Sequence, residues 1–565
     1  MILSLIFLAS GIVLPVYRFL VIFFFIQNLC AELVFEAPLS YQHETNVQKL
    51  VNVRVPKSHI KVFIPSIPYS YISHLTNGSL LRLSDNDEGW EFMMAKSYLK
   101  KDPTTYIFKL RENIFFQDGT PFNAHSVHEN FSYFIKQPFT YTDIHKRLKS
   151  VEVLDSYTVA FHLNKPYGMF FHDLARINLY TSVYLQKFGW QGSSTGDSTQ
   201  EPGKYGLGPY ILHEGFATGR KQTKTVTLKA NPYYYEEGKP YIETITIYTE
   251  LPTDRAVESV INEEGVLDIA VIPFNKKIET VLSPYAKLVT MPSTHNITNF
   301  FNLMKPNGIL KNKDIRLALN QAIDQQNLLT FVYKREGFIA PSAESVNYSA
   351  VKKAIQGMKT HGELFRDKMP SNDTLVNTLN GVVLNVVTQD RFMFLWRGIE
   401  YQLQQYGVSL NYHITSSEKE LYELLLTNRE NPKEWDILTW GNDDWYGNHP
   451  WTVFFTYRTS SAWSAIDSDD IMQELLETLF YQDNHTPEFL MTVKKIVQRA
   501  YDEAYMLIVP SPNLVMAINK EIFFKPSSVA IMPLWDAKIT SEHWSLREGA
   551  YKRESQYPFF PLRYE

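Results

Sequence analysis

Residues 381–440 read GVVLNVVTQDRFMFLWRGIEYQLQQYGVSLNYHITSSEKELYELLLTNRENPKEWDILTW, and they are the part of the chain most informative about its architecture. It alternates apolar runs that have the Val, Ile and aromatic content of strands with two longer amphipathic stretches. The strand-like runs span 382–387, 408–414 and 435–440, and the amphipathic stretches span 392–405 and 418–426. This β-α-β-α-β order predicts a parallel, doubly wound sheet in an α/β fold.

Ligands of doubly wound sheets bind in the crevice beyond the carboxyl ends of the strands. In this chain those ends lead into the loops at 388–391 and 441–450. The first loop contains Arg391, and the second contains His449, an imidazole that could also reach a metal. We therefore predict that Arg391 and the 442–449 loop contact a ligand.

Upstream, residues 108–131 read FKLRENIFFQDGTPFNAHSVHENF and predict a strand, a tight turn and a helix in succession. The turn is the Asp-Gly-Thr-Pro sequence at 118–121. Asn123 is placed to cap the helix. The residues expected on the apolar sides of the strand and the helix are Tyr106, Phe108, Leu110, Val127, Phe131 and Phe134.

The first 31 residues differ in kind from the rest of the chain. Two apolar runs, 2–16 and 19–26, are separated by Arg18, and Ala31 precedes the first acidic residue. This pattern predicts a signal peptide at 1–31 and an exported protein. The alternative is an uncleaved anchor, because ~25 apolar residues are enough to span a bilayer. The single cysteine, Cys30, lies in this segment, so the mature chain has no disulfide, which fits a bacterial periplasmic protein better than a eukaryotic secreted one.

Composition and incomplete motifs argue against several classes of function. The 565 residues are 44% hydrophobic and 20% charged, with a net charge of −5, so the chain has no basic footprint for nucleic acid. The G-x-S-x-G sequence at 192–196 lacks the core strand that a nucleophile elbow needs before it. His125 and His128 lack the spacing of a zincin. We therefore expect no catalytic residue, no resident metal site and no cofactor.

Six segments in sequence order resemble one family, the extracytoplasmic solute-binding proteins of peptide and nickel ABC importers (bacterial solute-binding protein family 5), with nickel-type members most similar. The segments are 108–131, 206–210 (GLGPY), 229–241 (KANPYYYEEGKPY), 314–328 (DIRLALNQAIDQQNL), 381–440 and 502–510 (DEAYMLIVP). The resemblance implies a two-lobed periplasmic-binding-protein fold of type II, with three domains that close around a hinge. A first-lobe domain would comprise 32–83, 199–299 and 508–565, an inserted domain 84–198, and a second-lobe domain 300–507.

The same resemblance implies a periplasmic subunit of an ABC importer. This subunit would capture a peptide or a nickel or other metal–chelator complex by hinge closure and deliver it to an inner-membrane permease. It would act as a monomer without binding nucleic acid. A membrane-tethered or secreted ligand-sensing receptor is the alternative, and a secreted hydrolase is a weaker one.

The two types of relative imply different site residues in the loop after the last predicted strand. Peptide binders hold the amino terminus of the ligand with an aspartate followed by an aromatic residue, a pair matched by Asp444 and Trp445 or, in another alignment, by Asp443. Nickel-type members line the site with a tryptophan, matched here by Trp440.

Other candidate contacts lie earlier in the chain. Nickel-type members use an arginine to pair the carboxylates of a chelator, and Arg176 or Leu179 occupies its place. Tyr69 and Tyr71 precede the first helix of the first lobe and are expected to stack on a ligand.

Overall fold

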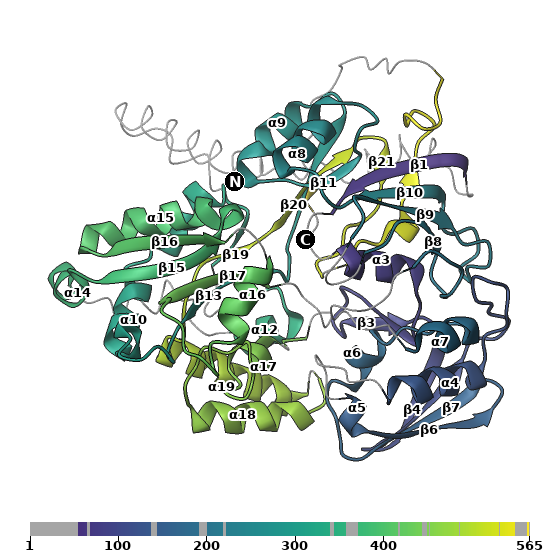
Figure 1. Ribbon diagram of the computed structural model, residues 1–565, viewed down its shortest axis with the longest axis horizontal. Coiled ribbons are helices and arrows are strands. Elements are labelled where there is room, and N and C mark those ends of the chain that lie inside the picture. The colour runs from purple at the N-terminus through teal and green to yellow at the C-terminus, as the bar shows by residue number, and fades with distance from the viewer. Residues whose placement is uncertain are drawn as a thin grey trace, which may run out of the picture. The chain divides into compact units, whose positions relative to one another are not determined.

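The computed structural model describes residues 55–64, 68–136, 144–190, 201–217, 222–339, 344–356, 371–415, 418–442, 449–450, 452–484, 486–529, 531–548 and 562–563 (Figure 1). The expected signal peptide at 1–31 lies outside these residues. Within the described part of the chain, no helix is both long enough and apolar enough to cross a membrane.

The stretch at 381–440 forms a β-α-β-α-β unit, as predicted. Its elements are β15 (Val383–Gln389), α15 (Met393–Leu403), β16 (Ser409–Thr415), α16 (Glu418–Leu426) and β17 (Ile437–Asn442). β15 pairs in parallel with both β16 and β17, and Figure 1 shows the strands side by side. The sheet is mixed rather than wholly parallel, because β13 (Asn296–Phe301) runs antiparallel to β17 and to β18 (Met506–Leu507). β13 and β18 come from distant parts of the chain, so the pattern within 381–440 could not predict them.

A second sheet takes its described strands in the order β23-β12-β20-β11-β1-β10-β9-β8. β1 pairs in parallel with β10 and β11, and β20 lies antiparallel between β11 and β12. The buried face of α8 (Thr253–Asn262) packs against this sheet. The strands are β1 (Val55–Phe63), β8 (Tyr210–Glu214), β9 (Thr225–Ala230), β10 (Ile242–Tyr248), β11 (Ile269–Val271), β12 (Ala286–Met291), β20 (Leu514–Asn519) and β23 (Leu562–Arg563).

Two short connections join these sheets. β12 ends at Met291 and β13 begins at Asn296, while β18 ends at Leu507 and β20 begins at Leu514. Met291 pairs with Leu514 on one side of the crossing, and Asn299 pairs with Leu507 on the other. The chain therefore crosses between the sheets twice, at neighbouring positions and in opposite directions.

A third, antiparallel sheet has the order β4-β5-β7-β6 and comes from one continuous stretch of chain. The predicted strand is β5, and its residues Tyr106, Phe108 and Leu110 are buried as expected. Asn123 caps α4 by accepting hydrogen bonds from the backbone of His125 and Ser126, which confirms the predicted cap. The elements here are β4 (Ala95–Asp102), β5 (Thr105–Leu110), β6 (Leu148–Asp155), β7 (Thr158–Leu163), α4 (Ala124–Phe134), α5 (Ile144–Arg147), α6 (Phe170–Leu174) and α7 (Ser182–Phe188).

The remaining elements connect or flank the sheets. Helices α18 and α19 pack on each other, and α12 packs on α19. The bounds of these elements are α3 (Pro68–Thr76), β2 (Leu81–Leu83), β3 (Trp90–Phe92), α9 (Lys277–Leu282), α10 (Lys313–Gln321), α11 (Gln325–Asn327), β14 (Gly337–Phe338), α12 (Ser349–Ala354), α14 (Asn372–Leu379), α17 (Thr452–Thr456), α18 (Asp470–Tyr481), α19 (Pro487–Glu503), β19 (Ser511–Pro512), β21 (Ile522–Phe523) and β22 (Lys538–Ile539).

A buried carboxylate ties the second sheet to the segment that follows it. Asp268 is fully buried and precedes β11. It accepts hydrogen bonds from the backbone nitrogen of Lys61 at 2.8 Å, the side-chain amide of Asn519 at 2.9 Å and the indole nitrogen of Trp544 at 2.8 Å. A buried charge is tolerated only when its acceptor sites are satisfied, so this carboxylate fixes β1, β20 and residue 544 against one another.

We predict that Asp268→Asn lowers the free energy of unfolding by about 3 kcal/mol, because the amide group presents an N–H to donors that need an acceptor. The measurement is the urea midpoint at constant m-value. Asp373→Asn, an exposed change in the first turn of α14, is the matched control and should cost only a few tenths of a kcal/mol. Equal losses in the two variants would contradict the role given to Asp268.

Candidate ligand-binding site

The carboxyl end of β17 carries an aromatic stack. Trp440 stacks on Trp463 with ring centroids 4.7 Å apart and an interplanar angle of 18°. Tyr422 of α16 meets both rings edge-on, at 6.1 Å from Trp440 and 5.4 Å from Trp463. Trp440 is only 7% exposed. It therefore belongs to a preformed aromatic wall, and sequence reasoning missed its two partners.

Arg391 lies beside the same end of β17, as the doubly wound order predicts. Its side chain is exposed, its Nε donates to Gln389 Oε1 at 3.0 Å, and its guanidinium lies 4.9 Å from the centre of the Phe392 ring. A Cβ added to Gly441 would lie 3.9 Å from Arg391 Nη2 and 3.1 Å from Phe392 Cζ. The glycine therefore makes room for the ring of Phe392, and the guanidinium of Arg391, which can pair with a carboxylate, lies beside it.

Several predicted contacts cannot be placed. Asp443, Asp444 and Trp445 lie outside the described residues, and so does the side chain of Tyr69 in the first turn of α3. The prediction that Tyr69 and Tyr71 precede the first helix is wrong, because α3 already begins at Pro68; Tyr71, within this helix, is half-buried and packs against the main core.

His449, predicted as a loop histidine, is buried with 2% exposure. Its ring centroid lies 4.8 Å from that of His172 and 5.5 Å from that of Phe489. His172 belongs to α6, next to the four-stranded sheet, and Phe489 belongs to α19. The loop after β17 therefore ends in a contact between two distant parts of the chain.

Arg176 follows α6 and is half-buried, whereas Leu179, its alternative in the alignment, is fully buried and donates its backbone N–H to Gly78 at 2.7 Å. Leu179 is therefore part of the core. Burial, and secondarily the positive charge of Arg176, lowers the pKa of His74 to about 4. At neutral pH the imidazole of His74 is therefore uncharged beside Arg176.

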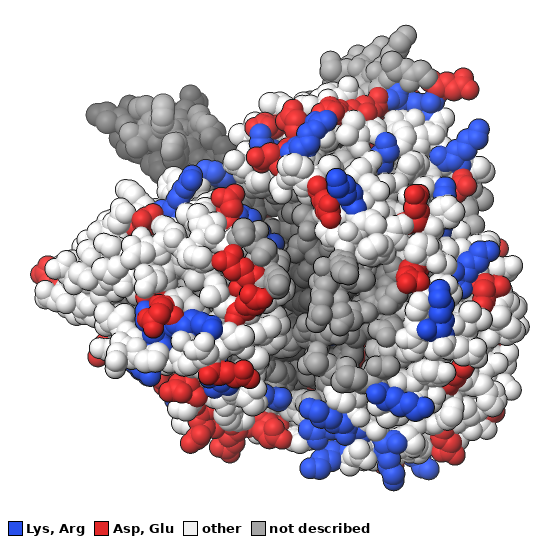
Figure 2. All heavy atoms as spheres, viewed as in Figure 1, with Lys and Arg blue, Asp and Glu red and all other residues white. Residues whose placement is uncertain are grey.

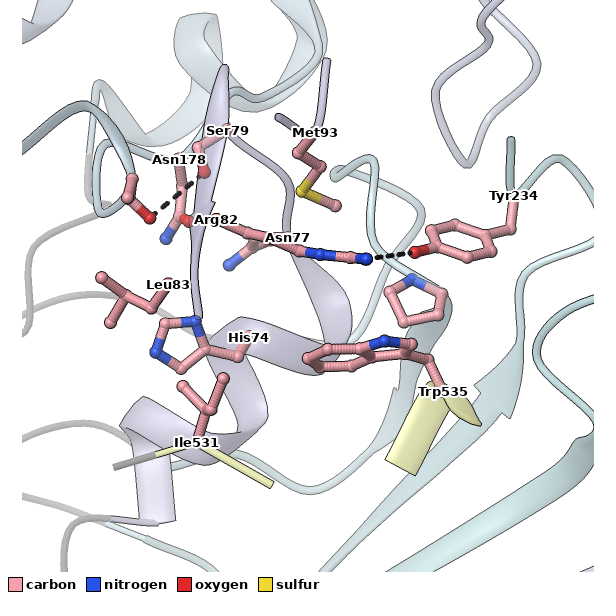
Figure 3. Close-up of a pocket in the computed structure, with 12 residues that line it drawn as sticks. His74, Asn77, Ser79, Arg82, Leu83, Met93, Asn178, Tyr234, Ile531 and Trp535 are labelled. Carbon is pink, nitrogen blue, oxygen red and sulfur yellow. Dashed lines mark hydrogen bonds between the residues drawn. The ribbon is translucent and has the colours of Figure 1, made fainter. Parts of the chain in front are cut away.

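A cavity opens next to His74 (Figure 3). The volume open to an occupant is about 20 Å³, room for a single water molecule or one ligand oxygen, at the bottom of a recess that opens to solvent. The indole nitrogen of Trp535 is buried in its wall and has no hydrogen-bond acceptor among the described residues. The lining residues are His74, Asn77, Ser79, Arg82, Leu83, Met93, Ala175, Asn178, Pro209, Tyr234, Ile531 and Trp535.

The charge inside this cavity is compensated. Arg82 pairs with Glu91 and, at 2.8 Å, with Glu236, and its guanidinium lies 5.1 Å from the centre of the Trp535 ring. Figure 3 shows its further hydrogen bond to the hydroxyl of Tyr234, at 3.3 Å. Burial opposes ionisation of Glu236, but Arg82 and a hydrogen bond from Lys239 outweigh it and lower its pKa to about 2. The cavity thus offers hydrogen-bond donors without a large net charge.

Sequence reasoning missed His74, Trp535 and Trp463. None of them belongs to a local motif. Each becomes part of a site only because residues far apart in the chain come together, as His74 and Trp535 do in lining one cavity and Trp463 does in stacking on Trp440. The only sequence signal was residue type, since tryptophan and histidine are amphipathic side chains that often line ligand pockets.

Comparison with known proteins places the chain in a family. Residues 90–465 match the family described as bacterial extracellular solute-binding proteins, family 5 middle. Among curated relatives, the glutathione-binding protein GsiB of Escherichia coli K12 is 27% identical over 258 residues, which cover 44% of this chain and 46% of that protein. GsiB of Salmonella typhimurium is 26% identical over 265 residues, 46% of this chain and 48% of that protein. The match therefore spans about half the length of these relatives.

Solved structures share the fold over most of the chain. NikA from Brucella suis, in complex with Fe(III)-EDTA, has a TM-score of 0.70 at 16% identity and covers 85% of this chain and 100% of its own. AppA from Bacillus subtilis, in complex with a nonapeptide, has a TM-score of 0.69 at 17% identity, with 86% and 100% covered. DppA from Helicobacter pylori, in complex with the peptide STSA, has a TM-score of 0.68 at 15% identity, with 88% and 100% covered. The fold is the type II periplasmic-binding-protein fold, and the chain belongs to the bacterial extracellular solute-binding proteins of family 5.

Proposed function

We propose that this chain is the solute-binding subunit of an ABC importer and captures a peptide or a metal–chelator complex by hinge closure. One observation carries the proposal. The family match at 90–465 includes the carboxyl end of β17, which carries the Trp440–Trp463 stack on one face of the strand and has Arg391 next to Gly441 on the other. The relatives are solute-binding proteins, and we propose binding rather than catalysis as the role of this chain.

We propose a first-lobe domain of 32–83, 199–299 and 508–565, an inserted domain of 84–198 and a second-lobe domain of 300–507. The described strands of the eight-stranded sheet come from separate stretches at 55–63, 210–291, 514–519 and 562–563, which supports a discontinuous first domain. The four-stranded sheet comes from 95–163 alone. β13 begins at Asn296 and pairs within the five-stranded sheet, four residues before the expected boundary at 300, so we propose to place the start of the second lobe between Met291 and Asn296.

The proposed ligand-binding residues have different chemical roles. The aromatic wall at Trp440 stacks on planar groups, and Arg391 and Arg176 pair with carboxylates. Asp443 or Asp444 binds an ammonium group, with Trp445 beside it. The other proposed contacts are His449, Tyr69 and Tyr71.

The cavity of Figure 3 supplies a further contact in this proposal. The N–H of Trp535 needs an acceptor, and the amide groups of Asn77 and Asn178 line the same cavity. A carbonyl or carboxylate oxygen of the ligand meets that need. Peptides and chelators both carry such oxygens, so the cavity is compatible with either class.

We also propose that residues 1–31 are a signal peptide, that the mature protein is periplasmic and monomeric, and that its partner is an inner-membrane permease. A membrane-tethered or secreted receptor is the alternative. An intact-mass measurement of protein purified from its own host separates cleaved from anchored protein, because cleavage leaves an N-terminus near residue 32, whereas an anchor retains the segment. A test for permease-dependent uptake then separates the solute-binding subunit from a receptor.

We predict that one ligand class raises the melting temperature. The probes are glutathione, a tripeptide mixture and the nickel–histidine complex, with glycine and a simple nickel salt as controls. A ligand at 100 times its dissociation constant should add about 2.7 kcal/mol to the free energy of unfolding. Identical melting curves with all three probes would contradict capture of these solutes.

We predict that Trp535→Phe weakens binding of the probe that raises the melting temperature by roughly 2- to 12-fold, because it removes one N–H and keeps an aromatic ring over Arg82. Isothermal titration measures the change. Trp90→Phe, which removes an indole N–H outside the cavity, is the matched control and should leave the affinity unchanged. Unchanged affinity of Trp535→Phe would remove this cavity from the binding site.

We predict a pH dependence of stability that belongs to His74. Its pKa is about 4 in the folded protein, whereas histidine in an unfolded chain titrates near 6.5, so the unfolded state binds more protons between these values. Above pH 6.5 His74 is neutral in both states, so the free energy of unfolding does not change with pH on its account. As the pH drops from 6.5 toward 4, the free energy of unfolding falls by up to about 3 kcal/mol. Urea unfolding at pH 7 and pH 4.5 should show a smaller difference for His74→Gln than for the parent. His125→Gln, on an exposed helix position, should retain the parental difference.

A further inference from the structure

Two distant parts of the chain touch at backbone level. The backbone N–H of Gly168, between β7 and α6, donates to the carbonyl of Phe480 at 3.2 Å. A Cβ added to Gly168 would lie 2.1 Å from the carbonyl oxygen of Gln482, which is far inside van der Waals contact. Residue 168 therefore has to be glycine for these backbones to approach so closely.

Side chains pack around this backbone contact. The rings of Tyr167 and Phe480 lie 5.1 Å apart, and these residues are only 3% and 4% exposed. The guanidinium of Arg147 lies 4.9 Å from the centre of the Phe480 ring, and its Nη1 donates to the hydroxyl of Tyr481 at 3.4 Å. We call the set Arg147, Tyr167, Gly168, Phe480, Tyr481 and Gln482 the rim contact.

Complementary charges also join the two parts of the chain that meet at the rim contact. Figure 2 shows basic side chains over the four-stranded sheet and acidic side chains over α18. Lys100 of β4 pairs with Asp483 at 2.7 Å, and Lys353 of α12 pairs with Asp87 at 2.7 Å. These pairs are exposed, so each contributes little stability. Both join the same two parts of the chain, and they favour one relative orientation of those parts.

The rim contact also lies next to the loop that follows β17. His172 lies four residues after Gly168, and its ring centroid is 4.8 Å from that of His449. The distance from His172 Nε2 to Asn484 Nδ2 is 3.4 Å. His449 ends the loop proposed to hold the ligand. The rim contact and the end of the ligand loop are therefore neighbours, through His172 and His449.

We infer that the rim contact is a closing contact: it forms when the inserted domain and the second lobe come together, and it sets how much of the ligand-free protein is closed. The inference rests on the proposed hinge closure. The apparent affinity for the solute equals the affinity of the closed form multiplied by the fraction of protein that is closed. Residues of the rim contact therefore change the apparent affinity without touching the solute. Gly168 is the positioning residue, because any larger side chain separates the backbones.

The test measures a distance without any ligand. Cys30, the single cysteine, is changed to Ser, and spin labels are attached at Lys109→Cys on β5 and Met491→Cys on α19, both exposed positions. Double electron–electron resonance should show a short-distance population in this parent. Gly168→Ala should remove most of that population, about tenfold or more, because overpacking at a backbone contact has no room to relax.

Charge variants keep the test independent of how well Gly168→Ala folds. Lys100→Glu places like charges against Asp483 and should reduce the short-distance population, and Lys100→Glu with Asp483→Lys should restore it. Lys96→Glu is the matched control on the same strand, because the partner of Lys96, Glu112, is close in sequence and lies on the same side of the contact. This control should leave the distances unchanged.

The outcomes separate this inference from the proposed function. A short-distance population that persists in both Gly168→Ala and Lys100→Glu, or that is missing from the parent, overturns the closing contact even if a probe solute binds. The closing contact is supported if the short-distance population is lost in both single variants and restored in the double variant, even if none of the probe solutes raises the melting temperature.

Discussion

The double crossing between the two large sheets is the constraint on which the rest of the molecule depends. β12 and β20 pair antiparallel in one sheet, and after short connections β13 and β18 pair antiparallel in the other. β13 is buried at all six positions and lies between β17 and β18. It therefore fixes where the carboxyl end of β17 lies, and with it the aromatic wall and Arg391. Two adjacent connections with few residues also form the kind of joint about which packed bodies rotate.

The two places proposed to contact a ligand, the aromatic wall at Trp440 and the cavity at His74, differ in chemistry. The aromatic wall at Trp440 is preformed, because its rings stack on one another, so no ordering of side chains opposes the binding of a planar group. The cavity at His74 is polar, yet its charges are compensated by Glu91 and Glu236, and the imidazole is neutral at pH 7. An apolar surface with a few placed donors is the usual composition of a small-molecule site. Solute identity then depends on which oxygens and planar groups reach these donors and rings.

Local sequence predicted local structure well. The alternation at Tyr106, Phe108 and Leu110 became β5, Asn123 became a helix cap, and the alternation in 381–440 became strands and helices with parallel pairing. These features depend on interactions within a few residues, which a pattern records directly. The antiparallel β13 was not predicted, because strand pairing across more than 100 residues leaves no periodic trace in the sequence. The partners of Trp440 were missed for the same reason.

Local patterns in the sequence were enough for the α/β class, the family resemblance and the edge of the sheet where a ligand is expected to bind. The tertiary structure brought together side chains that are far apart in the sequence, at that edge and elsewhere. Trp463 reaches Trp440, Trp535 reaches the cavity beside His74, and Gly168 approaches the backbone of Gln482. It also buried His449, which the loop pattern treated as accessible. The physical reason is that secondary structure follows from periodic burial along the chain, whereas a site depends on distances between residues that only packing of the whole chain brings together.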